Sequence, residues 1–176
     1  MYPLSRLITS GLKASFGKKL AFGEISEIEF ITRPWDLDMF LEMNNGRVLT
    51  LYDLGRFDLA IRSGFTKALR QNGWGLAVAG STIRYRRRIT LFEKVSLRTV
   101  PIGYEGRWFY LGQSMWVGDK PASNALLRTC VTEKGKAIGV SRVASALGNP
   151  DWNPELPEWV KAWDNADNQR VWPPVP

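Results

Sequence analysis

The sequence predicts an α+β fold in which an antiparallel β-sheet curls around one long central helix. A run of apolar and helix-forming residues over 46–70 follows a single β-rich segment and precedes four more. Turns at 103–106, 118–121 and 133–136 separate the later β-rich segments, and each turn carries the Gly or Pro that a tight hairpin needs. The length of 176 residues and the hydrophobic fraction of 44% are enough to bury one such core.

Residues 1–23 are predicted to form an N-terminal arm or short amphipathic helix. Apolar residues recur at helical spacing at Leu4, Leu7, Ile8 and Leu12, with basic residues at Arg6, Lys13, Lys18 and Lys19. We expect this helix to pack on the domain; peripheral contact with a membrane surface is the less favoured alternative. The segment is too polar for a signal peptide, and with no run of about 18 apolar residues we expect no membrane span.

Residues 24–148 are predicted to form the main domain, which begins with a strand over 24–33. The long helix that follows starts at a cap formed by Asn44 or Asn45. Gly55 inside it indicates close backbone packing, because glycine costs about 1 kcal/mol there relative to alanine. The later strands are expected over 76–89, 94–103, 107–117 and 123–133.

Residues 149–176 form a Trp- and Pro-rich tail, expected to pack on the domain through one short helix from Glu155 to Asp164. Trp159 and Trp163 lie one helical turn apart, so we expect them to bury one face against the sheet. No repeat of 20 to 50 residues divides the chain further.

The residue counts exclude several kinds of chemistry. The chain contains no histidine, which excludes Ser-His-Asp and Cys-His catalysis and any His-ligated metal site. Cys130 is the only cysteine, so no internal disulfide or Cys-cluster metal site can form, and we interpret it as an inert buried thiol. We expect a cytoplasmic protein without a metal or redox cofactor. The net charge of +7, from 24 Lys and Arg against 17 Asp and Glu, favours anionic partners.

The segment around the start of the long helix carries the candidate chemistry. Residues 36–47 read Asp-Leu-Asp-Met-Phe-Leu-Glu-Met-Asn-Asn-Gly-Arg, and residues 52–56 read Tyr-Asp-Leu-Gly-Arg. Carboxylates just before a helix N-terminus lie beside backbone amides and a partial positive charge, an arrangement suited to acyl transfer. Over about residues 24–145 the chain resembles the hotdog-fold thioesterases, particularly the 4-hydroxybenzoyl-CoA thioesterase-like and acyl-CoA thioesterase group. Members of that group carry Asp-x-Asp, three residues, His, one residue and then Asn-Asn.

The resemblance implies a hotdog fold and hydrolysis of an acyl-CoA thioester. By position, Asp38 matches the family's nucleophile or general base, and the backbone amide of Asn45 matches the donor that polarises the thioester carbonyl. Asn44 and Gly46 flank that amide and are expected to bind substrate. Asp53 matches the helix position at which another branch of the superfamily keeps its catalytic carboxylate. Because the family's active sites form where two subunits meet, the resemblance also implies a homodimer or homotetramer.

Two residues depart from the family pattern. Glu42 stands where the family has histidine, and Phe40 stands where some acyl-carrier thioesterases have asparagine. A glutamate can still act as a base if burial or the nearby Asp38 raises its pKa. The missing histidine also motivates an alternative function, that of a non-catalytic acyl-CoA-binding or interaction protein with the same fold.

Structural roles compete with the catalytic assignments. Asp36 and Asp38 are also typical of helix caps, which bind backbone amides for a gain of about 1 kcal/mol. Asp53 is also placed to pair with Arg56, three residues later on the same helix.

Residues 84–88 form a basic run, Arg-Tyr-Arg-Arg-Arg, on a predicted strand. Alternation along the strand places Arg84, Arg86 and Arg88 on one face, where one of them could hold the nucleotide phosphates of coenzyme A. A solvated face or pairing with acidic residues is the structural alternative. We expect no nucleic acid partner, since the aromatic residues that would stack on bases are scattered among strands.

Overall fold

The computed structural model describes residues 4–171 and 173–174. The helices are α1 (Leu4–Phe16), α2 (Asn45–Arg62), α3 (Phe65–Asn72), α4 (Val140–Ala146) and α5 (Glu158–Asn168), with a short 3-10 turn at Pro34–Asp36. The strands are β1 (Ser26–Ile31), β2 (Trp74–Tyr85), β3 (Lys94–Glu105), β4 (Trp108–Val117), β5 (Lys120–Glu133) and β6 (Lys136–Ala137).

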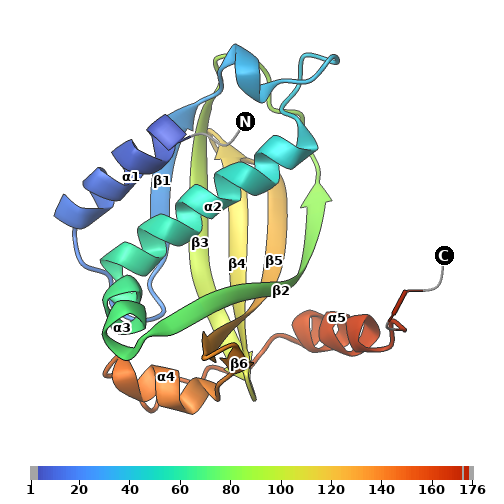
Figure 1. Ribbon diagram of the computed structural model, residues 1–176. Helices are drawn as coiled ribbons and strands as arrows, with labels where there is room; N and C mark the ends of the chain where they lie inside the picture. Colours follow the sequence, from blue (N-terminus) through green and yellow to red (C-terminus); the bar gives the residue numbers. More distant parts are fainter. Residues whose placement is uncertain (1–3, 172, 175–176) are drawn as a thin grey trace.

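The strands form one curled antiparallel sheet in the order β1-β3-β4-β5-β2, with the short β6 paired to β5. Figure 1 shows α2 crossing the concave side of this sheet. The tight turns of the hairpins contain Gly106, Gly118 and Gly135, each with a positive φ angle that glycine adopts without strain. The predicted α+β hotdog architecture is therefore confirmed.

The main core lies between α2 and the sheet. Its helix side is formed by buried side chains that include Val48, Leu51 and Leu54, which pack against Leu97 and Met115 of the sheet. Gly55 lets the helix backbone approach β3 closely, because a Cβ there would overlap the Leu97 side chain and lie 2.5 Å from Thr99 Oγ1. The close packing predicted from this glycine is confirmed.

The long helix is interrupted, which the sequence pattern over 46–70 did not predict. Gly64 has a φ of +79°, so the chain leaves the right-handed helical region there, and α2 and α3 are separate helices. The strand expected over 76–89 also ends early, at Tyr85. Beyond it the amides of Arg86 and Arg87 both donate to the carbonyl oxygen of Ala122, at 2.8 and 3.1 Å, so strand alternation does not extend to Arg88.

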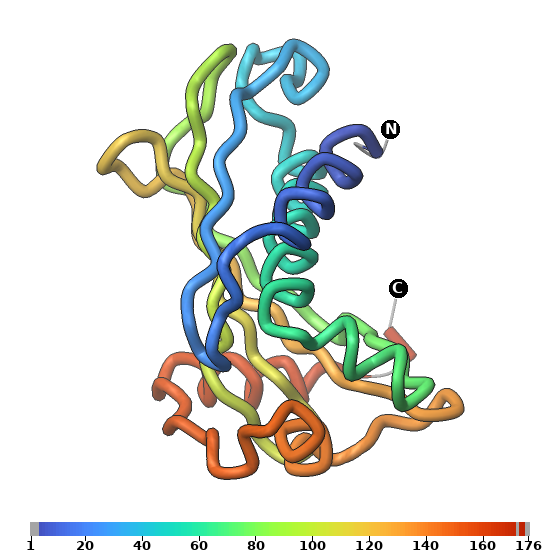
Figure 2. Tube along the Cα trace, turned by 90° about the vertical axis from the view of Figure 1, so that its left-hand side faces the viewer, coloured from blue at the N-terminus to red at the C-terminus, as the bar shows by residue number. Residues whose placement is uncertain are grey.

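Helix α1 packs along α2 through its inner face (Figure 2). Ala14 is fully buried and Leu7 packs against the main core. Arg6 anchors the beginning of the helix, since its Nη2 donates to the carbonyl oxygen of Ile31 at 2.9 Å and lies 2.8 Å from the Asp36 carboxylate.

The C-terminal segment covers the other face of the sheet. Leu126 and Leu127 are neighbours on β5 and therefore point to opposite faces. Leu127 belongs to the core that contains α2, whereas Leu126 packs against Leu156 and Val160 of the tail. The tail helix α5 begins and ends a few residues later than expected, and Trp159 stays half exposed instead of burying a face beside Trp163. The sequence pattern gave no indication of α4.

Candidate active site

A small hairpin, residues 37–43, precedes α2. Leu37 and Met43 form an isolated antiparallel bridge, and the Asp38 amide donates to the carbonyl oxygen of Glu42 at 2.9 Å. The apolar tip, Met39, Phe40 and Leu41, is exposed to solvent. These backbone bonds hold Asp38 and Glu42 opposite each other at the base of one loop.

The two aspartates of the motif have different environments. Asp36 is fully buried, accepts a hydrogen bond from the Arg33 amide at 2.9 Å and contacts the guanidinium groups of Arg6 and Arg47. It ties α1, the loop and the first turn of α2 together. Asp38 is partly exposed, and its Oδ1 accepts a hydrogen bond from the Phe40 amide at 2.8 Å. Asp36 is thus a structural residue, and Asp38 is the more accessible carboxylate.

The N-terminus of α2 is capped by Asn44. Its side-chain oxygen accepts hydrogen bonds from the amides of Gly46 at 2.9 Å and Arg47 at 3.2 Å. The cap therefore comes from the asparagine, and the expectation that Asp36 or Asp38 binds these amides is wrong. Asn45 is the first helical residue, so its amide has no acceptor within the helix and lies at the positive end of the helix dipole.

A surface pocket brings several predicted residues together. Glu42, Asn45, Arg86 and Arg88 share this pocket with hydrophobic neighbours that include Val48. Glu42 Oε2 lies 2.9 Å from Arg88 Nε, which links the loop before α2 to the segment after β2. Arg87 lines the pocket as well, so the pocket combines a helix N-terminus, one carboxylate and three arginines.

A buried hydroxyl pair lies beside the pocket. Tyr52 Oη and Ser123 Oγ are 2.9 Å apart, and Ser123 also lines the pocket. Burial raises the pKa of the Tyr52 hydroxyl, so this group stays protonated and neutral at physiological pH. It supports the pocket as a hydrogen-bonding group and not as a proton acceptor.

Asp53 lies outside this pocket. It pairs with Arg56 on the same helix, as the structural alternative predicted, and Arg56 Nη1 donates to Gln113 Oε1 at 2.7 Å. Gln113 is buried and in turn donates to the Tyr52 carbonyl oxygen at 2.8 Å. Asp53 comes eight residues after Asn45, which places it about 12 Å farther along the helix axis. Asp53 is therefore part of a polar chain between α2 and the sheet.

Arg84 is also separated from the other arginines. It lies on β2 and lines a groove with Trp159 and Trp163 of α5, on the face of the sheet that the tail covers. The expectation that Arg84, Arg86 and Arg88 share one face is wrong, because the strand ends between the first and second of them.

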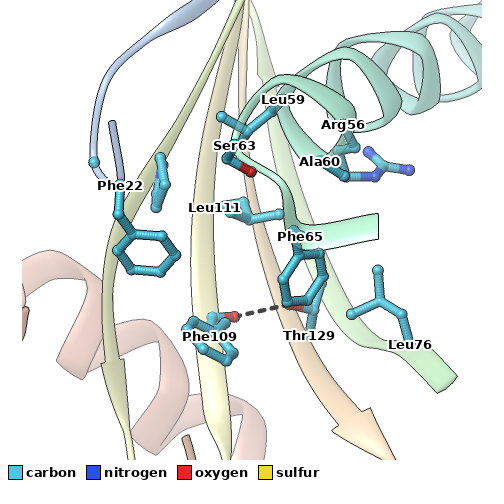
Figure 3. A pocket seen from close by; sticks show the side chains of 12 residues that line it. Phe22, Arg56, Leu59, Ala60, Ser63, Phe65, Leu76, Phe109, Leu111 and Thr129 are labelled. Atoms are coloured by element: carbon cyan, nitrogen blue, oxygen red, sulfur yellow. Dashed lines mark hydrogen bonds between the residues drawn. The ribbon is translucent and has the colours of Figure 1, made fainter. Parts of the chain in front are cut away.

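A second, apolar pocket lies between the C-terminal half of α2 and the sheet, and sequence reasoning missed it (Figure 3). Its lining includes Phe22, Leu59, Phe65, Phe109 and Leu111. Figure 3 shows Arg56 at the α2 side of this pocket and Leu76 at its β2 side. Its residues come from segments far apart in the sequence, so no local pattern could have identified them.

Comparison with protein families and known sequences agrees with this fold. A model of the thioesterase-like superfamily matches residues 32–163. The chain is 30% identical to Protein THEM6 of Xenopus laevis over 142 residues, which is 79% of this chain and 69% of that protein. It is 27% identical to Protein THEM6 of Drosophila melanogaster over 154 residues, covering 86% and 78% of the two chains.

Solved structures show the same architecture. The probable thioesterase YbaW of Escherichia coli superimposes with a TM-score of 0.66 at 19% identity, over 70% of this chain and 97% of that one. The DHNA-CoA thioesterase of Staphylococcus aureus gives a TM-score of 0.60 at 18% identity, over 82% and 91%. The family match over most of the chain, together with the hotdog fold, identifies this protein as a member of the thioesterase-like superfamily.

Proposed function

We propose that the protein hydrolyses an acyl-CoA thioester to the free acid and coenzyme A. Membership in the thioesterase-like superfamily supports thioester hydrolysis as the general class of reaction. The observation that carries the finer assignment is the pocket that the first residue of α2 lines together with Arg86 and Arg88. Glu42 also lines it, and the backbone of Glu42 is bonded to that of Asp38 in the same loop. A structural neighbour, SAV2348 of Staphylococcus aureus, is described in complex with CoA, and its TM-score is 0.57 at 10% identity.

In the proposed mechanism Asp38 supplies the carboxylate, which either attacks the carbonyl carbon or activates water. In the first route the carbon–sulfur bond breaks as the Asp38 oxygen bonds to the carbon, and water then hydrolyses the resulting mixed anhydride, giving one proton to the thiolate and regenerating Asp38. In the water route, the water oxygen bonds to the carbonyl carbon while its proton passes to Asp38. The carbon–sulfur bond then breaks, and the departing thiolate recovers that proton. The Asn45 amide donates to the oxyanion that forms in between, an interaction typically worth about 3 to 4 kcal/mol of barrier.

The other polar residues of the pocket position the substrate. Forked guanidinium groups suit phosphate oxygens, so we assign Arg86 and Arg88 to the phosphates of coenzyme A. Glu42 lines the same pocket and is close in the chain to Asp38, which favours a role in orienting water. Asp53 is less suited to that role because its carboxylate pairs with Arg56.

We also propose that the working unit is a homodimer joined through β2. This strand of twelve residues forms one edge of the sheet, and Leu76 and Val78 on it are about half exposed. An unprotected edge of this length offers backbone groups that a second strand can pair with. The pocket is lined by Tyr85, the last residue of β2, and by Arg86 to Arg88 directly after it, so pairing there would bring the second copy next to the site.

The alternative function is that of an acyl-CoA-binding protein without hydrolysis. It is favoured by Glu42, which replaces the family's histidine and is already engaged by Arg88. The apolar pocket at Leu59 and Phe109 gives an acyl chain a place to bind whether or not hydrolysis follows.

The decisive experiment measures thiol release from short, long and aromatic acyl-CoAs by the wild type, Asp38→Asn and Asp53→Asn. We expect turnover by the wild type, its loss in Asp38→Asn and its retention in Asp53→Asn. Loss in Asp53→Asn alone would move the catalytic role to α2. Binding of acyl-CoA by calorimetry with no turnover by the wild type would select the alternative function.

A further inference from the structure

The outward side of α1 carries an apolar stripe that nothing in the described structure covers. Leu4, Ile8, Leu12 and Phe16 follow one another at four-residue intervals along the helix, and their exposed fractions are 62%, 62%, 57% and 89%. The stripe spans about 18 Å at 1.5 Å per residue. The inner face of the same helix already contributes Leu7 and Ala14 to the core. Packing on α2 therefore does not account for these four side chains.

The N-terminal segment that carries this stripe has charged residues of one sign. Residues 1–23 contain four basic residues and no acidic residue, and three of the four, Lys13, Lys18 and Lys19, are exposed. On the neighbouring strand β1, Glu29 pairs with Lys94 at 2.8 Å and Glu27 lies 3.4 Å from Arg98. Those carboxylates are thus balanced by cations of β3, and the lysines of the N-terminal segment leave a basic margin beside the apolar stripe.

A second copy of the chain does not fit this surface well. Two α1 helices brought together would place like charges side by side at low dielectric. The β2 edge, where we expect the dimer to form, lies at the opposite end of the sheet from β1 and α1 (Figure 1). Dimerisation through β2 would therefore leave the stripe uncovered.

We propose that α1 docks the protein on an anionic membrane surface. The helix would lie in the plane of the interface, with Ile8, Leu12 and Phe16 among the lipid chains and the lysines at the headgroups, as interfacial amphipathic helices do. In the described residues no helix is long and apolar enough to cross a bilayer, and this mode of binding requires none. The proposal is independent of whether the protein hydrolyses thioesters.

The test is flotation of the full chain with two kinds of vesicle, pure phosphatidylcholine and phosphatidylcholine mixed with phosphatidylglycerol. We expect binding to the anionic vesicles, at least tenfold weaker binding to the neutral ones, and release as NaCl approaches about 1 M, where the Debye length falls to about 3 Å. The double variant Ile8→Ser, Leu12→Ser should lose binding by about tenfold or more, because its apolar contacts are removed.

Two further variants separate docking from folding. The first is the double variant Lys18→Glu, Lys19→Glu, whose two positions come after the end of α1 and leave the stripe intact. It should also reduce binding to anionic vesicles by at least about tenfold. Trp159→Ser removes an exposed apolar side chain from the opposite face of the sheet and should bind as the wild type does. Three results would overturn the proposal: equal binding to both kinds of vesicle, unchanged binding by either the serine or the glutamate double variant, or no binding by the wild type. The last result would instead favour an acidic protein partner.

Discussion

The Glu42 carboxylate and the Arg88 guanidinium lie 2.9 Å apart and join the loop before α2 to the segment after β2. Glu42 occupies the position at which the hotdog thioesterases that this chain resembles have histidine. The Glu42 carboxylate is already engaged by a cation, so we assign this residue a positioning role and not that of the catalytic base. The same pair positions Arg88 at the pocket mouth, where a phosphate group can replace the carboxylate as its partner.

This arrangement predicts different effects for the two carboxylates of the loop. Asp38→Asn should lower kcat for an acyl-CoA by about a hundredfold or more, the usual loss when a catalytic acid or base is removed. Glu42→Gln should lower it by less than about tenfold, because in the proposed mechanism that side chain orients water and does not take up the proton. Steady-state thiol release with the best acyl-CoA measures both. A larger loss in Glu42→Gln than in Asp38→Asn would show that the glutamate is the base.

The arginines that follow β2 are predicted to recognise the nucleotide end of the substrate. Arg88→Gln should raise KM for acyl-CoA by about tenfold, since a hydrogen bond to a charged group is worth about 1.5 to 3 kcal/mol. The same variant should leave KM unchanged for an acyl-pantetheine, which lacks the nucleotide phosphates. Arg84→Gln is the matched control, because that side chain lines a different groove on the other face of the sheet. Equal effects of the two variants would contradict the assignment.

The sequence predicts the fold better than it predicts the site. Hairpin glycines and the apolar run of α2 are local signals, and the presence of Gly55 correctly predicts close packing, which the structure shows to be against β3. The end of β2 is not a local signal, because it depends on hydrogen bonds from Arg86 and Arg87 to Ala122, a residue of the distant β5. The grouping of Arg84 with Arg86 fails for that reason.

Long-range contacts also decide the roles of the acidic residues. Asp36 and Asp38 are equivalent in the sequence motif, yet only Asp36 meets Arg6, which comes from a helix 30 residues earlier. Asp53 and its partner Arg56 are close in the sequence, and this pair was correctly predicted. Its further link to Gln113 depends on the packing of α2 against β4 and has no sequence pattern of its own.

Gly55→Ala is expected to destabilise the protein. A methyl group there would overlap Leu97 and lie 2.5 Å from Thr99 Oγ1, and both neighbours are fully buried. Overpacking of this kind typically costs about 1 to 3 kcal/mol, whereas alanine in an open helical position would stabilise by about 1 kcal/mol. Urea denaturation followed by circular dichroism gives the free energy of unfolding. An unchanged or increased value would show that α2 can move away from β3.

The buried cation Arg128 is predicted to hold α5 on the sheet. Its guanidinium lies 2.6 Å from Asp164 and 2.7 Å from Asp167. Burial alone would raise the pKa of the Asp164 carboxyl, but the hydrogen bond and charge of Arg128, with hydrogen bonds from Tyr110 and Asn168, outweigh burial and lower it. Arg128→Met should therefore reduce the free energy of unfolding by about 1.5 to 3 kcal/mol at pH 7, the usual value of a hydrogen bond to a charged group, because the partly exposed Asp164 and Asp167 lose this partner.

The pH dependence of that loss has a definite sign. In the wild type the lowered pKa of Asp164 adds stability above the usual value of 3.8, and this stability is lost as pH falls through the lowered pKa. In Arg128→Met the part of this stability that depends on Arg128 is absent at every pH. The difference between the two proteins should therefore stay constant from pH 7 down to about pH 4 and shrink as the pH falls further. Arg142→Met removes a much more exposed arginine and should change stability far less; a pH-independent difference for Arg128→Met would contradict this account.

Val78→Lys tests whether β2 joins two copies of the chain. The side chain is 54% exposed on an edge strand, so lysine is tolerated in a monomer but would place a charge inside a β2–β2 interface. Light scattering should give about twice the 19.9 kDa chain mass for the wild type and the single chain mass for the variant. Val171→Lys makes the same substitution at an exposed site outside the sheet, and this variant should remain dimeric. Thiol release should fall together with dimerisation, because the pocket at Arg86 and Arg88 directly follows the paired strand. A wild type that is monomeric and fully active would exclude a site shared between subunits.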